Sequence, residues 1–288
     1  MAAKKRFGQH FLRCRNSVAR IVELAGVTAS SSRVVEIGPG RGVLTAALID
    51  AGASVRAVEV DRDLAADLRV DIPELHLLEC DALSVDWEDL APSPPGWTVC
   101  ANLPYNVATP LVTRMVTMRP RLRRMVLMFQ REVAERLVAQ PNTRAYGSLS
   151  IHTQAFCDAK IAFHLPPSAF SPPPNVESSV VVFELRETPL HGDCTPRFFE
   201  KAVRAGFSRR RKVLPNALSI AFPKDLVREV LERLGHAKQR AQELDIEQWA
   251  TLAAALEVAV AERAEASEAA ECNIPSDAGG GGTAALRL

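Results

Sequence analysis

The stretch Arg33-Val34-Val35-Glu36-Ile37-Gly38-Pro39-Gly40-Arg41-Gly42 decides the fold of the N-terminal part of the chain. Its first five residues are mostly β-branched and predict a strand. The glycines predict a tight loop, and a helix follows through about Asp50. This order of strand, glycine loop and helix is typical of a parallel sheet that holds a ligand against the loop backbone, near a helix N-terminus.

The alternation of strands and helices continues toward the C-terminus, which predicts an α/β fold with a parallel sheet covered by helices. Strand patterns lie over residues 54–60, 75–80, 97–101 and 122–130, and helical patterns over 63–70, 108–118 and 132–139. Segments 148–156, 159–165 and 178–185 complete the set, the last two as antiparallel strands at one edge. The prolines between those two strands predict a stiff surface loop.

The character of the chain changes to helical from about Thr188. Apolar residues recur at helical spacing around Phe199, Leu226 and Trp249, the last behind the expected N-cap Asp245. We expect a first domain over residues 1–187 and a small all-helical domain over 188–262. Residues 263–288 are rich in Ala, Glu and Gly without apolar periodicity, so we expect a disordered tail.

Composition excludes some classes of protein. No apolar stretch is long enough to span a bilayer, and no signal-peptide core follows the basic N-terminus, so we expect a cytoplasmic location and no membrane partner. The six cysteines are scattered without a C-x-x-C pair, which argues against a metal site.

Charge is unevenly distributed along the chain. The net charge is +1, but residues 257–288 carry six acids and two bases, which leaves +5 on the rest. Bases cluster at residues 4–6, 119–124 and 209–212. Three clusters on a basic body favour a polyanionic partner.

Two acidic residues follow strands beside the glycine loop. Glu59 ends the second predicted strand, where a carboxylate accepts hydrogen bonds from two ribose hydroxyls. Asp81 closes the third, placed to receive an adenine amino group. Together with Gly38 and Gly40 they predict a nucleoside pocket at the carboxyl edge of the sheet.

Asn102-Leu103-Pro104-Tyr105 ends the fourth predicted strand. An adenine amine is a poor nucleophile because its lone pair is delocalised into the ring. The Asn102 side-chain oxygen and the Leu103 carbonyl suit acceptance of both N–H hydrogens, which favours a pyramidal nitrogen in the transition state. Pro104 fixes the turn, and the Tyr105 ring offers a face for stacking a base withdrawn from its RNA stack.

The sequence resembles the rRNA adenine-N6 dimethyltransferases, specifically the bacterial small-subunit branch, from about residue 4 to residue 260. The resemblance rests on several blocks in order, which are Lys5-Arg6-Phe7-Gly8-Gln9-His10-Phe11-Leu12, Val35-Glu36-Ile37-Gly38-Pro39-Gly40-Arg41-Gly42, Ala101-Asn102-Leu103-Pro104-Tyr105-Asn106, Phe129-Gln130-Arg131-Glu132-Val133-Ala134, Phe170-Ser171-Pro172-Pro173-Pro174-Asn175-Val176-Glu177-Ser178 and Arg209-Arg210-Arg211-Lys212. It implies a Rossmann-like class I methyltransferase sheet with helices on both faces and a small helical C-terminal domain.

The resemblance also implies S-adenosylmethionine as methyl donor and assigns roles around it. His10 and Leu12 would close over the cofactor, Gly38 would line its methionine end, and Asn102 would reach both cofactor and target. Glu59 would bind the ribose and Asp81 the adenine, as the residues alone suggest. Phe170 would be a second aromatic on the target base, facing Tyr105.

The implied reaction is dimethylation of two adjacent adenosines in the 3′-terminal hairpin of 16S rRNA, on an immature 30S subunit, by a monomer. RNA would be bound by the basic block Arg209, Arg210, Arg211 and Lys212. The family usually continues this block as Lys-Thr-Leu-Arg-Asn, whereas this chain has Lys212-Val213-Leu214-Pro215-Asn216. Because proline is disfavoured inside a helix, the helix here should begin near Leu214 or kink.

Three alternatives remain open. A 23S rRNA adenine-N6 methyltransferase of the macrolide-resistance branch shares the fold, but that branch tends to have isoleucine where Leu103 stands. A non-catalytic assembly or transcription factor of the same fold would not need the intact tetrapeptide. An NAD-dependent oxidoreductase is disfavoured because Val43 replaces the third glycine of its fingerprint.

Overall fold

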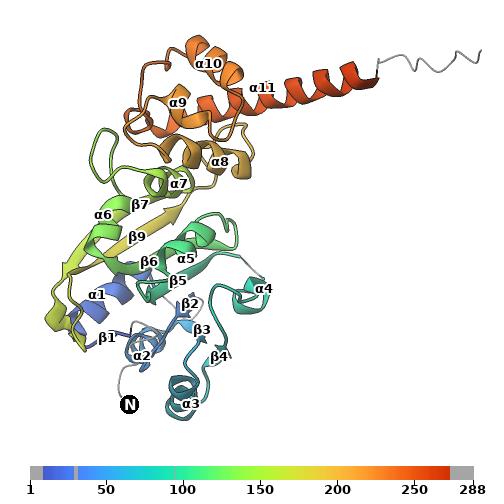
Figure 1. Ribbon diagram of the computed structural model, residues 1–288. Coiled ribbons are helices and arrows are strands. Elements are labelled where there is room, and N and C mark those ends of the chain that lie inside the picture. The colour runs from blue at the N-terminus through green and yellow to red at the C-terminus, as the bar shows by residue number, and fades with distance from the viewer. Residues whose placement is uncertain (1–8, 29–31, 94, 273–288) are drawn as a thin grey trace, which may run out of the picture.

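The computed structural model describes residues 9–28, 32–93 and 95–272. Its main sheet has seven strands in the order β4-β3-β2-β5-β6-β9-β7 (Figure 1). The strands are β4 (His76–Glu79), β3 (Ser54–Glu59), β2 (Arg33–Ile37), β5 (Trp97–Asn102), β6 (Leu122–Gln130), β9 (Ser178–Leu185) and β7 (Cys157–Leu165). Neighbours from β4 to β6 are parallel, and β9 is antiparallel to both β6 and β7.

Helices cover both faces of this sheet, as the sequence predicts. The alternation along β6 shows why, since Met125, Leu127 and Phe129 enter one apolar core while Val126 and Met128 enter the other. One face is covered by α1 (Arg15–Ala25) and α2 (Val43–Asp50). The other is covered by α4 (Trp87–Leu90), α5 (Ala108–Met115), α6 (Arg131–Leu137) and α7 (Ser148–Phe156), while α3 (Arg62–Asp71) connects β3 to β4.

The order of the strands reverses between β2 and β5. The chain runs from β2 outward to β3 and β4, then returns to pair β5 on the other side of β2. The loops that leave β2 and β5 therefore diverge at the carboxyl edge of the sheet. In doubly wound sheets this switch point is where ligands bind.

The helical region consists of α8 (Pro196–Phe207), α9 (Leu214–Leu218), α10 (Lys224–Arg233) and α11 (Ile246–Cys272). The Thr195 hydroxyl caps α8 by accepting from the Phe198 N–H, and Pro196 occupies the first turn. Buried side chains of α5, α8 and α11, among them Phe199 and Trp249, belong to one continuous apolar cluster. The helical region therefore extends the core of the sheet rather than enclosing a separate one.

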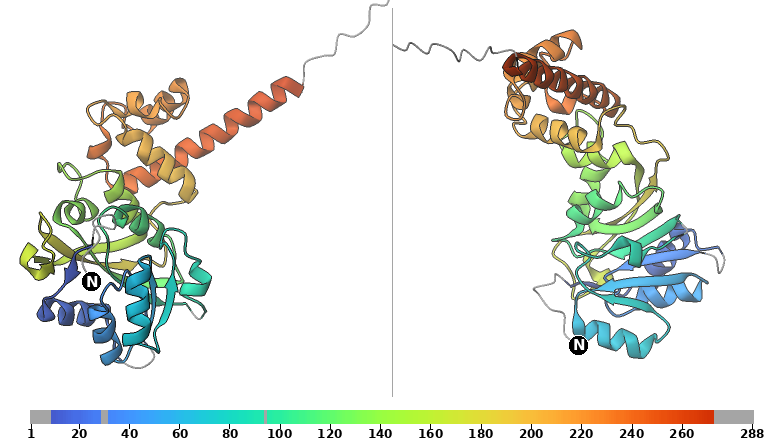
Figure 2. Two further views of the ribbon diagram at one scale, coloured as in Figure 1. Left: turned by 60° about the horizontal axis from the view of Figure 1, so that its bottom comes forward. Right: turned by 90° about the vertical axis from the view of Figure 1, so that its right-hand side faces the viewer.

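The prediction that regular structure ends near Arg263 is wrong, because α11 continues to Cys272. Figures 1 and 2 show the C-terminal part of this helix projecting away from the rest of the molecule. Ala and Glu form helices without needing an apolar face, which explains a helix where periodicity is missing. The rest of the expected tail lies outside the described residues. None of the helices described is long and apolar enough to cross a membrane.

Candidate active site

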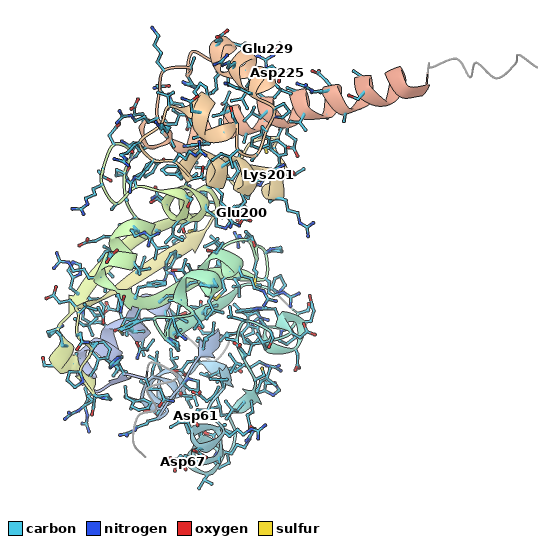
Figure 3. All side chains as sticks on the ribbon, in the orientation of Figure 1. Asp61, Asp67, Glu200, Lys201, Asp225 and Glu229 are labelled. Carbon is cyan, nitrogen blue, oxygen red and sulfur yellow. The ribbon has the colours of Figure 1, made fainter. Side chains whose placement is uncertain are left out.

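A cavity lies at the switch point, where four segments far apart in the sequence meet. It is lined by residues of the loop after β2, by Glu59 at the end of β3, and by the tetrapeptide after β5. Gln9 to Leu12 complete the lining from the N-terminal side. Figure 3 places Asp61, just beyond Glu59, near the start of α3, far from Glu200 and Asp225 of the helical region.

The glycine loop follows β2 closely because its residues adopt backbone conformations that other residues avoid. Gly38 and Gly40 have φ values of +67° and +62°. The Gly38 N–H donates to the Val58 carbonyl (2.9 Å), which ties the loop to β3. A Cβ at Gly40 would stand 3.1 Å from the ring of Phe11. Side chains here would therefore fill space between the loop and the N-terminal segment.

Glu59 is buried and shapes the turn after β3. Its carboxylate accepts from the backbone N–H groups of Gly40 (3.1 Å) and Asp61 (2.9 Å). Burial raises the pKa of Glu59, and these hydrogen bonds oppose that rise. Each carboxylate oxygen retains a lone pair for a further donor, so the structure leaves Glu59 able to bind a ligand hydroxyl.

Glu36 is a functional candidate that the sequence analysis missed. It lines the cavity with 2% of its surface exposed, and its Oε2 has no hydrogen-bond partner. Burial, together with the nearby charge of Glu59, raises the pKa of Glu36 to about 7. The sequence did contain a signal for Glu36, which is an acid between the apolar residues Val35 and Ile37 of a predicted strand. An acid is costly to bury without a partner, so its presence there indicates a function.

The tetrapeptide Asn102-Leu103-Pro104-Tyr105 is held from several sides. Asn102 donates its amide Nδ2 hydrogen to the carbonyl of His10 (2.8 Å), which leaves its Oδ1 as an acceptor. Leu103 is buried, and Pro104 faces Gly38, whose missing Cβ would lie 4.0 Å from its ring. The Tyr105 hydroxyl is 2.7 Å from the hydroxyl oxygen of Ser178.

The N-terminal segment lies over this tetrapeptide. Its short strand β1 (Phe11–Leu12) pairs with β8 (Phe170–Ser171) of the proline-rich segment. The His10 ring stacks on Tyr105 with 5.8 Å between ring centroids, and its Nδ1 donates to the Pro172 carbonyl (2.8 Å). The structure therefore places His10 and Leu12 at the cavity, where the resemblance puts them.

Phe170 is not where the resemblance puts it. Its side chain is 2% exposed, opposite Leu12 in the small sheet, and it packs in the apolar core under α1. The ring that lies against Tyr105 in the structure is that of His10. The proline-rich segment is thus not only a surface loop, because the 3₁₀ turn Pro167–Ala169 and β8 carry Phe170 inward.

Asp81 also lies apart from the cavity in this structure. It is exposed in the turn after β4, where its Oδ1 accepts from the Leu83 N–H (2.9 Å) and Ser84 donates to its carbonyl. It is not among the residues that line the cavity beside Glu59. In the structure, Asp81 therefore stabilises a local turn and does not line the cavity.

The basic block lies in the turn between α8 and α9. Arg209, Arg210, Arg211 and Lys212 are all exposed. The guanidinium of Arg210 also donates to the carbonyls of Arg144 (2.7 Å) and Tyr146 (2.8 Å), so it holds a neighbouring loop.

Pro215 has the expected effect on the helix after this block. Helix α9 begins at Leu214, and Pro215 lies in its first turn, where no intrahelical donor is needed. The prediction of a helix start near Leu214 is confirmed.

The other two basic clusters give less support for a polyanion surface. Arg119, Arg121 and Arg124 form ion pairs with carboxylates, those of Glu187, Glu88 and Glu184. Three of the four arginines of this cluster therefore have carboxylate partners within the protein, whereas Arg123 is exposed. Residues 4–6 lie outside the described part of the chain.

Comparison with known proteins supports a single family. The model of the family described as ribosomal RNA adenine dimethylase matches residues 1–257. The chain is 40% identical over 263 residues to the ribosomal RNA small subunit methyltransferase A of Thermosynechococcus vestitus, covering 88% of this chain and 97% of that protein. It is 43% identical over 217 residues to the protein of the same name from Alcanivorax borkumensis, covering 75% and 77%.

Solved structures agree over most of the chain. A dimethyladenosine transferase from Plasmodium falciparum aligns with a TM-score of 0.75 at 26% identity, covering 87% of this chain and 98% of that one. The 23S rRNA methyltransferase ErmE aligns with a TM-score of 0.63 at 25% identity, covering 86% and 99%. From its sequence and its fold, the chain belongs to the ribosomal RNA adenine dimethylase family.

Proposed function

We propose that this protein uses S-adenosylmethionine to dimethylate the N6 amines of two adjacent adenosines in the 3′-terminal hairpin of 16S rRNA. One observation carries the proposal. Asn102 is anchored through its amide nitrogen at the cavity, with its oxygen left as an acceptor, and Tyr105, three residues further along the chain, lines the same cavity.

The residues of the cavity fit the proposed methyl donor. A ligand laid along Gly38 and Gly40 meets backbone rather than side chain, and Glu59 retains acceptor capacity for ribose hydroxyls. The unpaired Oε2 of Glu36 supplies a negative partner for an ammonium group. When bound, the donor supplies an electrophilic methyl group on a sulfonium.

The protein's part in the reaction is to position the target amine and stabilise its charge. The Asn102 Oδ1 and the Leu103 carbonyl would accept the two N–H hydrogens, which draws the amine lone pair out of conjugation with the ring. The Tyr105 ring would stack on the adenine after it leaves its RNA stack. No strong general base is required, because the methylated nitrogen loses its proton readily to water.

RNA contact would come from the three bases of the block that do not anchor the neighbouring loop. Arg209, Arg211 and Lys212 present charge to solvent beside the helical region. We propose that the partner is an immature 30S subunit, that the protein acts as a monomer in the cytoplasm, and that residues 188–262 serve as its RNA-binding domain.

Mapping of the modified positions tests this proposal. Unmethylated 30S subunits would be incubated with the protein and methyl donor, and the rRNA cut by a specific ribonuclease and analysed by mass spectrometry. We expect two adjacent adenosines of the 3′-terminal hairpin, each with two added methyl groups. Methylation elsewhere, or at a different base, would overturn the proposed target.

A further inference from the structure

Ser178 closes the proline-rich sequence block but has no role in the proposed function. It is completely buried at the first position of β9. The backbone of β9 pairs there with β6 through Gln130 and with β7 through Leu165. The backbone of Ser178 is therefore held on both sides by the sheet, which fixes the position of its Cα atom.

The hydroxyl of this serine reaches the catalytic tetrapeptide. Its Oγ lies 2.7 Å from the Tyr105 hydroxyl, a hydrogen-bond distance, although the two residues are far apart in the sequence. Among the described residues, the ring that stacks on Tyr105 is that of His10, which belongs to the N-terminal segment. The phenol end of Tyr105 is thus tied to the sheet, while one of its faces is covered by a separate segment.

We propose that Ser178 is a positioning residue, which fixes the position of the Tyr105 ring on which the target adenine stacks. This inference rests on the proposed function. A tyrosine ring swings about its Cα–Cβ bond and rotates about its own long axis. The hydrogen bond at the Tyr105 hydroxyl holds the far end of the ring in one place, and the stacked His10 ring limits rotation about the long axis. A base stacked on a misoriented ring carries its N6 away from the methyl group, and small misplacements of this kind slow a reaction strongly.

Kinetics of four variants test the inference. Ser178→Ala removes the hydroxyl and Tyr105→Phe removes its partner. Each is expected to lower kcat about tenfold, as for a lost hydrogen bond, while binding of S-adenosylmethionine stays unchanged. The double variant should be no slower than either single variant, because both remove one interaction. Fully additive losses, or an unchanged kcat in Ser178→Ala, would overturn the inference.

Ser179→Ala is the matched control. Ser179 is the next residue of β9 and equally buried, but its hydroxyl bonds to the His164 ring (2.8 Å) instead of the site. It should keep kcat within about twofold of the parent protein, because it costs a similar hydrogen bond without touching Tyr105. Equal losses of kcat in both serine variants would show a merely structural effect and contradict the inference.

A spectroscopic measurement separates this inference from the proposed function. The chain has only two tyrosines, Tyr105 and Tyr146, so 3-fluorotyrosine labelling gives two assignable fluorine resonances. Ser178→Ala should shift or broaden the Tyr105 resonance alone, and Ser179→Ala neither. If the parent protein methylates no rRNA, the proposed function fails. A Tyr105 resonance unchanged by Ser178→Ala overturns the positioning role whether or not rRNA is methylated.

Discussion

Asn102 is the residue on which the proposed chemistry depends most. Its amide nitrogen is engaged by the His10 carbonyl, so an incoming amine meets the oxygen. Asn102→Ala should abolish methyl transfer, while RNA affinity stays near that of the parent protein, because the exposed bases of the C-terminal region are untouched. Methyl transfer and RNA affinity would be measured on the same preparation. A loss of RNA affinity in proportion to activity would contradict the assignment.

Glu36 makes the stability of the ligand-free protein depend on pH. Its pKa is about 7 in the folded protein and near 4.5 when unfolded. The folded state therefore holds this proton more tightly. The resulting stabilisation is complete below about pH 4.5 and is lost as the pH rises through 7. At roughly 1.4 kcal/mol per pKa unit, the loss reaches about 3 kcal/mol.

Glu36→Gln should remove this pH dependence. Relative to the parent protein, the variant should gain stability between pH 5 and pH 8, measured as the free energy of unfolding in urea without cofactor. The comparison of the two proteins at each pH cancels the contributions of other titrating groups. Parallel pH profiles for the two proteins would show that Glu36 is not a buried, unpaired acid.

For single residues, the sequence predicted which side chains lie at the site better than it predicted whether a side chain is buried or exposed. The order of the strands alone brings Gly38, Glu59 and Asn102 to one edge of the sheet, and the structure places all three at the cavity. The burial of Phe170 and the exposure of Asp81 depend on tertiary packing of β1 against β8 and on a local turn. No spacing in the sequence encodes either.

The turn between α8 and α9 contains arginines with different roles, because Arg210 anchors a neighbouring loop and Arg211 does not. Arg210→Ala should lower the free energy of unfolding by about 1–3 kcal/mol, because two carbonyls of a partly buried loop lose a charged donor. Arg211→Ala is its matched partner and should leave stability unchanged. It should weaken RNA binding and reduce the dependence of affinity on salt by roughly one counterion.

These two variants would be compared by thermal unfolding and by RNA titration at several salt concentrations. If Arg210→Ala also lowers the salt dependence without loss of stability, the loop-anchoring role assigned to it is wrong.

Helix α8 carries a glycine in its last turn for a packing reason. Replacing an interior helix glycine by alanine ordinarily stabilises a protein by about 1 kcal/mol. At Gly206, however, a Cβ would lie 2.3 Å from the Trp249 ring of α11. Gly206→Ala should therefore destabilise the protein in urea unfolding, and a gain in stability would show that α8 and α11 pack less closely than the structure indicates.

The elements themselves were largely predictable from periodicity and from breakers. The strands from β2 to β6 and the helices α2, α3 and α5 lie within a few residues of their predicted ranges, since their apolar patterns are strong, whereas the short helix α4 was not predicted. The extension of α11 past Arg263 was not predictable from amphipathicity. An Ala- and Glu-rich helix that projects into solvent has no apolar face to reveal it.

At the scale of the whole molecule, the continuous core predicts how the protein unfolds. One apolar cluster joins the sheet to the helical region through α5, α7, α8 and α11. We therefore expect a single cooperative transition in differential scanning calorimetry, with Trp249→Ala lowering the midpoint of that one transition. Two separate transitions would instead favour independent domains, with a boundary near residue 187.

The proposed function requires that the protein methylates adenosines of the small ribosomal subunit rather than of the large one. The direct measurement offers labelled S-adenosylmethionine and the protein, in separate reactions, to unmethylated small and large ribosomal subunits, followed by digestion of the RNA to nucleosides. We expect label in dimethyladenosine from the small subunit alone. Label from the large subunit, or no labelled adenosine from either, would contradict it.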